Sequence, residues 1–150
     1  MIYYMFWDLT KTLSYNALLN FCIGERGVGK SFSAKKFVIN DYLKNGNEFV
    51  YIRRYKTELE TAYEGFFDQL QTAGFFEDHS FRIQQSKKKV DKFIIDKQVF
   101  GYGVPLSTAN ILKSASFPKV KTIIFDEFLI DNGTYHYLRN EVIQFLDIIE

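Results

Sequence analysis

The sequence predicts an α/β fold with a mostly parallel sheet flanked by helices and an antiparallel hairpin insertion. The first observation is a glycine-rich loop between an apolar stretch, residues 18–23, and a helical pattern, residues 30–44. The second is another apolar stretch, residues 48–52, because a strand, a helix and a second strand form a right-handed crossover in a parallel sheet. The third is an apolar stretch, residues 119–125, that ends in two acidic side chains. Ligands of such sheets bind beyond the carboxyl ends of the strands, where we expect these polar groups.

The glycine-rich loop reads Gly24-Glu25-Arg26-Gly27-Val28-Gly29-Lys30-Ser31, which is the G-x-x-x-x-G-K-S (Walker A) pattern of P-loop NTPases. Glycines let successive backbone N–H groups point at one anion, and the helix that begins at Lys30 adds its positive end. Lys30 is expected to reach the β- and γ-phosphates as a catalytic cation, and the Ser31 hydroxyl to hold Mg²⁺. The predicted nucleotide contacts here are Gly24, Gly27, Val28, Gly29, Lys30, Ser31 and Phe32. A glycine-rich turn without a ligand is the alternative, which the flanking patterns disfavour.

Composition points to one globular domain, or most of one, in 150 residues. Hydrophobic residues make up 47% of the chain, which argues against disorder. The net charge of +1 excludes a domain-wide basic field, so any nucleic-acid contact must come from a local patch. The single cysteine, Cys22, excludes an internal disulfide and fits a reducing cytoplasm. No apolar run approaches the roughly 20 residues that span a bilayer, so we expect no membrane partner.

Aromatic residues are frequent before the loop. Ser14 is expected to cap a short helix that continues through Leu18. Phe6, Trp7 and Tyr15 would offer a stacking surface to an adenine, and Tyr15 is the predicted contact. Packing of these rings over the sheet edge is the favoured alternative, because aromatic side chains bury large areas wherever they lie.

Three cations follow the second predicted strand, at Arg53, Arg54 and Lys56. Their place at a strand end predicts contacts with the phosphates of a nucleotide, in the same subunit or in a neighbouring one. A solvated turn paired with Glu58 and Glu60 is an equally good interpretation. The sequence alone therefore leaves the role of these cations open.

A helix with a break near Gly65 is expected over residues 57–74, and the antiparallel hairpin follows. The hairpin turns at Asp96-Lys97 and carries a second, basic turn at Ser86–Lys89. The lysines of the basic turn would contact a nucleic-acid backbone. A solvated turn is the favoured alternative for so short a charge run.

The strand over residues 119–125 ends in Asp126-Glu127, which is the Walker B form. Asp126 is expected to hold the Mg²⁺ shell, through water or through Ser31. Glu127 is the predicted catalytic residue that orients the attacking water, which favours ATP hydrolysis over transfer to a hydroxyl. Two acidic residues after a strand are common, so this pair indicates a nucleotide site only together with the glycine-rich loop. No Asn-Lys-x-Asp segment occurs, which favours ATP over GTP.

A helix is expected from Leu138 to Glu150, and its pattern runs to the last residue without a cap. We therefore interpret residues 1–150 as an ATPase domain truncated at its C-terminal end, without a sensor, an arginine finger or a C-terminal nucleic-acid-binding domain. His79 and His136 are isolated, so no metal site beyond Mg²⁺ is expected.

Beyond the two Walker motifs, the chain resembles the double-stranded DNA packaging ATPases of small podoviruses, the phi-twenty-nine-like phages. The resemblance covers residues 13–150. Its most distinctive part is Arg53-Arg54-Tyr55-Lys56 within residues 51–59. The other matching segments are Leu13-Ser14-Tyr15, Leu19-Asn20-Phe21, residues 23–31, Ile124-Phe125-Asp126-Glu127-Phe128 and Asn140-Glu141-Val142.

The resemblance implies a P-loop ATPase of the additional-strand, catalytic-glutamate class that forms a homo-oligomeric ring, with five subunits in the motor. It implies ATP hydrolysis that drives viral double-stranded DNA into a prohead. The implied partners are the DNA, the portal and prohead components, and a packaging RNA. The implied location is the host cytoplasm, transiently on the assembling prohead. Residues 1–150 alone would be a monomer that hydrolyses ATP poorly.

Two other functions remain open from the residues. One is a P-loop kinase or other phosphotransferase, which the adjacent Asp126 and Glu127 disfavour. The other is a nucleotide-gated assembly module that binds ATP without turnover. Replacement of Glu127 by Gln separates the second alternative from a motor, because a catalytic glutamate predicts retained binding and lost turnover.

Overall fold

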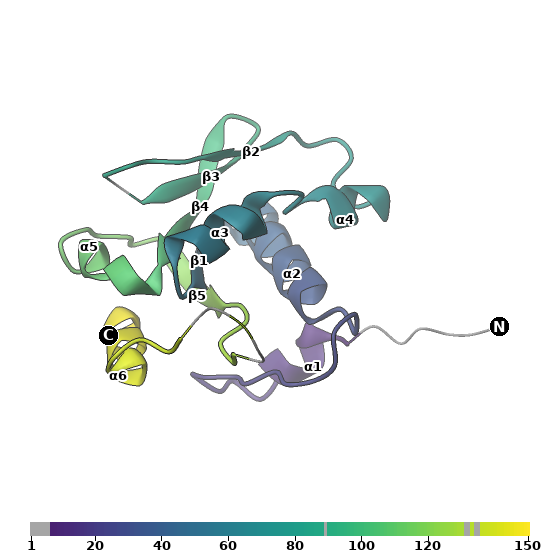
Figure 1. Cartoon of the computed structure of the whole chain (residues 1–150). Helices are drawn as coiled ribbons and strands as arrows, with labels where there is room; N and C mark the ends of the chain where they lie inside the picture. The colour runs from purple at the N-terminus through teal and green to yellow at the C-terminus, as the bar shows by residue number, and fades with distance from the viewer. Residues whose placement is uncertain (1–6, 89, 131–132, 134–135) are drawn as a thin grey trace.

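The computed structural model describes residues 7–88, 90–130, 133 and 136–150. Its five strands form one sheet in the order β2-β3-β4-β1-β5 (Figure 1). The strands are β1 (Glu48–Arg53), β2 (Phe81–Gln84), β3 (Asp91–Ile95), β4 (Gln98–Pro105) and β5 (Val120–Phe125). The helices are α1 (Leu9–Leu13), α2 (Lys30–Asn45), α3 (Lys56–Tyr63), α4 (Asp68–Thr72), α5 (Asn110–Lys113) and α6 (Glu141–Ile149), with a 3₁₀ turn η1 (Leu106–Thr108). Among the described residues, no helix has the length and apolarity needed to cross a membrane.

The sheet is mixed, which corrects the predicted mostly parallel sheet. β1 pairs in parallel with β4 on one side and with β5 on the other. β3 pairs antiparallel with both β2 and β4. The β3–β4 hairpin turns at Asp96 and Lys97, which both have positive φ, as the sequence predicted. Parallel and antiparallel pairings of the described strands are thus equal in number. The predicted fold class, a P-loop NTPase fold with a mostly parallel sheet, is therefore wrong for this sheet.

The apolar stretch before the glycine-rich loop is the main departure from the predicted fold. Residues 18–23 form no strand. The side chains of Leu18, Phe21 and Ile23 are exposed, at 84%, 69% and 72%. An apolar run becomes a strand only when a neighbouring strand pairs with it. This stretch has no such neighbour in the described part of the chain, and β5 lies at the end of the strand order.

The ends of the first two helices show how local sequence sets their limits. α1 begins after Asp8, whose carboxylate accepts a hydrogen bond from the Thr10 backbone N–H at 2.9 Å. Ser14 lies at the C-terminal end of α1, so the prediction that it begins a helix is wrong. α2 ends at Gly46, whose φ of +72° is readily adopted by glycine, and the predicted stop there is confirmed.

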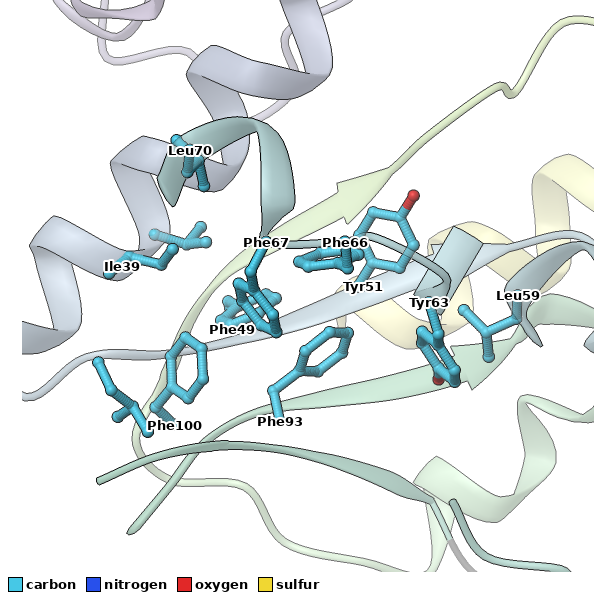
Figure 2. Close-up of a cluster of buried hydrophobic side chains, with 12 residues drawn as sticks. Ile39, Phe49, Tyr51, Leu59, Tyr63, Phe66, Phe67, Leu70, Phe93 and Phe100 are labelled. Carbon is cyan, nitrogen blue, oxygen red and sulfur yellow. The ribbon is translucent and has the colours of Figure 1, made fainter. Parts of the chain in front are cut away.

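Two hydrophobic clusters hold the helices on opposite faces of the sheet. Figure 2 shows the first, an aromatic cluster in which Phe49, Phe93 and Phe100 from three strands lie together. Helices α2, α3 and α4 add Ile39, Leu59 and Leu70 to the same cluster (Figure 2). The second cluster packs the other face, including Val50 and Ile52, under η1, α5 and α6. Alternation along β1 therefore sends odd-numbered side chains into the aromatic cluster and even-numbered ones into the second cluster.

Two glycines of β4 make room for this aromatic cluster. A Cβ atom at Gly101 would overlap the ring of Phe49, and one at Gly103 would overlap the Tyr63 hydroxyl. Tyr63 donates a 2.7 Å hydrogen bond to the buried Asp91 carboxylate next to that glycine. The bare backbone of β4 thus lets α3 and its tyrosine approach the sheet closely.

Candidate functional site

The glycine-rich loop wraps around the start of α2. Gly27 and Gly29 have φ values of +82° and +87°, which glycine adopts without a steric penalty. Lys30 is the first residue of α2, and its ammonium group donates to the carbonyl oxygens of Gly24 and Glu25, both at 2.6 Å. The lysine therefore closes the loop on itself. An anion bound at the start of α2 would offer the same ammonium group a charged acceptor.

The segment before α1 is fixed to this loop by its backbone. The Trp7 N–H donates to the Val28 carbonyl at 2.9 Å, and the Trp7 carbonyl accepts from the Ser33 hydroxyl at 2.5 Å. Trp7 also lines an open cleft together with Gly27, Lys30 and Asp126. The sequence favoured packing as the role of this tryptophan, and the structure places it beside the loop. Phe6, the other aromatic residue proposed there, lies outside the described residues.

Ser31 and Asp126 meet across 95 residues of sequence. The Ser31 hydroxyl lies 2.9 Å from Oδ1 and 3.0 Å from Oδ2 of Asp126. The strand pairing explains the contact, because β5 lies next to β1 and the Asp126 N–H continues the ladder to the Ile52 carbonyl at 3.1 Å. Both acidic residues therefore leave the sheet at the carboxyl end of β5, beside the first turn of α2.

Tyr51 also contacts the Asp126 carboxylate, from strand β1. Its hydroxyl donates to Oδ2 of Asp126 at 2.9 Å, and its side chain is 1% exposed. Burial raises the pKa of Tyr51, and the negative charge of Asp126 raises it further. The phenol therefore stays protonated and acts as a hydrogen-bond donor.

Arg53 and Glu127 form an ion pair beside this group. Arg53 Nη1 lies 2.6 Å from Glu127 Oε2, with the arginine side chain 11% exposed and the glutamate 61% exposed. Nη1 is held by Glu127, whereas Nε of Arg53 is buried and has no hydrogen-bond partner in the described part of the chain. A buried guanidinium with an open donor offers a place for a further anionic acceptor.

The backbone of Glu127 is strained. Its φ is +53°, in the left-handed region that non-glycine residues rarely adopt. The Glu127 N–H points back to Oδ1 of Asp126 at 3.1 Å. The turn places the two acidic side chains apart, one toward Ser31 and one toward Arg53. Such strain at a strand exit is typical of functional sites.

Arg54 comes directly after β1, and its side chain lies on the opposite side of the chain from that of Arg53, as alternation requires. It is 1% exposed, its Nε donates to Glu141 Oε1 at 2.6 Å, and its Nη2 donates to the Phe128 carbonyl at 2.6 Å. Its guanidinium also lies 4.8 Å from the centre of the Tyr137 ring. The structure therefore places Arg54 between β1, the segment after β5 and the start of α6, away from the Ser31–Asp126 group.

The other predicted contacts lie farther from this group. Lys56 is exposed at the start of α3 and lies 3.8 Å from Glu60 in a surface pair, which matches the solvated alternative. Tyr15 is 72% exposed in the turn after α1. Phe32 packs edge-to-face on Phe75 at a centroid distance of 6.0 Å, on the side of α2 that faces the core. Nucleotide contacts by these three residues remain predictions.

Two residues of this neighbourhood escaped sequence reasoning, Tyr51 and Lys35. Lys35 is half-buried on α2, with Nζ 4.0 Å from the centre of the Phe66 ring and 3.2 Å from the Phe66 carbonyl. Burial lowers the pKa of Lys35, and the Asp126 carboxylate opposes that shift. Sequence spacing could have pointed to both residues. Lys35 is four residues after Ser31 on a helix, and Tyr51 is two residues before Arg53 on a strand, so each shares a face with a predicted site residue.

The oxygen atoms of Ser31 and Asp126 fit a magnesium ion. Mg²⁺ prefers hard oxygen ligands and keeps much of its shell for water and substrate phosphate. Among the described residues, no cluster of three or more His, Cys, Asp or Glu residues could hold a metal by itself. A hydroxyl and a carboxylate beside a glycine-rich helix start would therefore suit a metal that arrives with a phosphate ligand.

The fold and this group of residues together define an α/β domain with a glycine-rich loop at the start of a helix, beside two acidic residues. The family model described as Podovirus DNA encapsidation protein (Gp16) matches residues 1–150. The chain belongs to this family.

Curated relatives are DNA packaging proteins of three Bacillus phages. Those of PZA and phi29 are each 39% identical over 146 residues, which is 97% of this chain and 42% of the relative. The protein of phage B103 is 41% identical over 138 residues, 92% of this chain and 40% of the relative. The chain thus spans about two fifths of the length of these relatives.

Solved structures agree with the sequence relationship. The N-terminal domain of the DNA packaging ATPase from bacteriophage phi29 superposes with a TM-score of 0.83 at 38% identity, covering 96% of this chain and 70% of that domain. The phi29 viral genome packaging motor assembly gives a TM-score of 0.77 at 39% identity, over 97% of this chain and 42% of that one. The small mixed sheet with its helices therefore matches the domain of this packaging ATPase, which replaces the P-loop NTPase fold predicted from the sequence.

Proposed function

We propose that this chain is the nucleotide-binding part of a subunit that packages viral double-stranded DNA, and that it binds and hydrolyses ATP with Mg²⁺ at the Gly24–Ser31 loop. The observation that carries this proposal is the meeting of Ser31 and Asp126 at 2.9 Å, with Glu127 next in the chain. An anion-binding loop, a hydroxyl and two carboxylates gather at one helix start. This is the set of groups that phosphoryl transfer to water requires.

The residues divide the work by chemistry. Loop N–H groups and the Lys30 ammonium would bind the phosphates, since the present acceptors of Lys30 are only neutral carbonyls. Ser31 and Asp126 would hold Mg²⁺, which supplies charge neutralisation of the phosphates when bound. Glu127 would orient and deprotonate the attacking water. The open Nε–H group of Arg53 would donate to a phosphate oxygen.

The partners are proposed by relationship. The relatives are DNA packaging proteins, and one solved neighbour is a viral genome packaging motor assembly. We propose that the subunit works in a homo-oligomeric ring, with five copies in the motor, beside the portal, the prohead and a packaging RNA, as the resemblance of its sequence to the packaging ATPases implies. The corresponding location is the host cytoplasm, transiently on the assembling prohead.

The test is ATP turnover by the intact gene product with and without long double-stranded DNA, at low and at raised salt. We expect turnover that requires Mg²⁺ and rises with DNA, with a stimulation that fades as salt increases because phosphate contacts release counterions. Glu127→Gln should retain ATP binding and lose turnover by about 100-fold or more. Turnover that survives this substitution would remove Glu127 from its role.

One observation favours a second function, a nucleotide-gated assembly module without turnover. Oε2 of Glu127 is paired with Arg53, so this oxygen must leave the guanidinium before it can take a proton from water. For such a module the wild type and Glu127→Gln would bind ATP equally and neither would hydrolyse it, with or without DNA. Turnover that ignores DNA but depends on a small acceptor would instead support a phosphotransferase.

A further inference from the structure

The Tyr51 hydroxyl is held in one place by its surroundings. The Tyr51 ring lies edge-on to Phe66 at a centroid distance of 5.0 Å and to Phe93 at 6.2 Å. Figure 2 shows the Tyr51 ring beside Phe66, with its oxygen at the outer end of the cluster. A ring packed in this way has few rotamers available, so the hydroxyl is aimed before any ligand binds.

The hydroxyl reaches a carboxylate that has a second donor. Oδ2 of Asp126 accepts from Tyr51 at 2.9 Å, and the Ser31 hydroxyl lies 3.0 Å from the same oxygen. The Ser31 oxygen can offer a lone pair to a metal while its hydrogen stays on Asp126. Ser31 lies in the glycine-rich loop and the first turn of α2, which a bound phosphate can shift, whereas Tyr51 holds the carboxylate from the sheet.

A neutral donor suits this position better than a cation. Arg53 and Lys35 lie close enough to influence Asp126 electrostatically, and either would neutralise its charge by pairing with it. A phenol fixes the direction of a carboxylate and leaves its negative charge for a bound cation. Carboxylates that bind metals are commonly held by such outer hydrogen bonds.

We propose that Tyr51 is a positioning residue, whose hydroxyl fixes the Asp126 carboxylate against Ser31 for the binding of Mg²⁺ with a nucleotide. This inference rests on the proposed function, because it assumes that Ser31 and Asp126 hold the metal. It assigns no contact between Tyr51 and the nucleotide. Loss of the hydroxyl should therefore change the dependence on Mg²⁺ and leave metal-free nucleotide binding as it is.

The test is Tyr51→Phe, which removes only the hydroxyl. Binding of a fluorescent ATP analogue is measured by polarisation, first in EDTA and then along a Mg²⁺ titration. We expect unchanged binding in EDTA and a rise of about tenfold in the Mg²⁺ concentration for half-maximal effect, as for other outer-sphere substitutions at metal sites. A half-maximal concentration equal to that of the wild type would overturn the proposal.

Tyr63→Phe is a matched control. Tyr63 also donates to a carboxylate, Asp91, at 2.7 Å, and its ring also packs on Phe93, at 5.6 Å. Loss of the Tyr63 hydroxyl should lower the melting temperature and leave the Mg²⁺ concentration for half-maximal effect unchanged. An equal Mg²⁺ shift in both variants would mean that a looser core, and not the position of Asp126, causes the effect, and would overturn the assignment.

Two further measurements separate the possible failures. In an Asp126→Asn background the Tyr51→Phe effect on Mg²⁺ should vanish, and a full, additive effect would contradict action through Asp126. In the wild type, the Tyr51 hydroxyl proton should stay protected in NMR spectra when Mg²⁺ and ADP are added, which tests the bond without any variant. Absence of nucleotide binding by the wild-type protein, or nucleotide binding that does not depend on Mg²⁺, would contradict the proposed function itself.

Discussion

Arg53 Nη1 lies 2.6 Å from Glu127 Oε2, and the arginine is much the more buried of the two partners. The pair occupies Oε2 of Glu127, one of the two oxygens that could accept a proton from water. The same guanidinium keeps a buried donor at Nε that has no partner in the described part of the chain. An arriving phosphate would thus compete with Glu127 for Arg53, and Glu127 would be released where a water must be activated.

The first prediction concerns Arg53→Ala. If the open guanidinium donor at Nε binds a phosphate oxygen, the substitution removes a charge-assisted hydrogen bond and weakens ATP binding about tenfold or more. Isothermal titration of ATP into the variant and the wild type measures the change. Arg82→Ala, which removes an exposed cation on β2, is the control and should leave ATP affinity unchanged.

Equal affinities of Arg53→Ala and the wild type would show that Arg53 serves Glu127 alone. In that case the variant should still alter turnover, because Glu127 loses its partner. Unchanged affinity together with unchanged turnover would remove Arg53 from the site altogether.

The second prediction concerns the buried pair of Arg54 and Glu141. Arg54→Ala leaves Glu141 without its partner and removes the donor to the Phe128 carbonyl, which should lower the free energy of unfolding by about 3–5 kcal/mol. Lys113→Ala breaks an exposed pair that also reaches α6, through Asp147 at 2.9 Å, and should cost less than about 1 kcal/mol. Urea unfolding followed by circular dichroism compares the two. Similar small losses in both variants would contradict the structural role assigned to Arg54.

The third prediction concerns the turn between β3 and β4. A hydrogen bond from His79 lowers the pKa of Asp96 below its ordinary 3.8, and the Ser80 N–H contributes to the shift. A carboxylate with a lowered pKa stabilises the fold above its ordinary value, and this contribution is lost as pH falls through the lowered value. The wild type should therefore exceed Asp96→Asn in stability at neutral pH, and the difference should close below about pH 3.8.

Melting temperatures from pH 7 down to pH 3 test this prediction. In a His79→Ala background the pH-dependent effect of Asp96→Asn should shrink, because the largest cause of the shift is gone. Asparagine tolerates the positive φ of this position, so the comparison isolates the charge. A difference that stays constant with pH would assign the effect to the turn and not to the carboxylate.

Local sequence predicted the parts of the structure that local physics determines. The stop at Gly46, the break near Gly65 and the turn at Asp96-Lys97 all follow from backbone preferences that single residues carry. The strand order does not follow from such preferences. Residues 18–23 are as apolar as β5, yet whether they pair depends on which segments are neighbours in the sheet.

The site shows the same division. The loop pattern and the acidic pair were visible as motifs, and the structure brings Ser31 and Asp126 together. The sequence did not predict a role for Tyr51 in the site, because an aromatic residue in a buried strand predicts only core packing. Its hydroxyl matters through a residue 75 positions later, and only the β1–β5 pairing brings the two together. Arg53 and Arg54 looked equivalent in sequence, and the alternation of the strand sends them to different faces.

The last prediction uses Trp7, the single tryptophan of the chain. Its backbone is hydrogen-bonded to Val28 in the loop and to Ser33 in α2, so a phosphate that rearranges the loop must change its environment. We expect a saturable change in tryptophan emission on addition of ATP. Lys30→Ala should abolish the change at the same ATP concentrations, because the loop then lacks its cation. An ATP-dependent emission change that persists in Lys30→Ala would place the nucleotide elsewhere, and no change in wild-type protein shown by titration to bind ATP would mean that the loop does not move against Trp7.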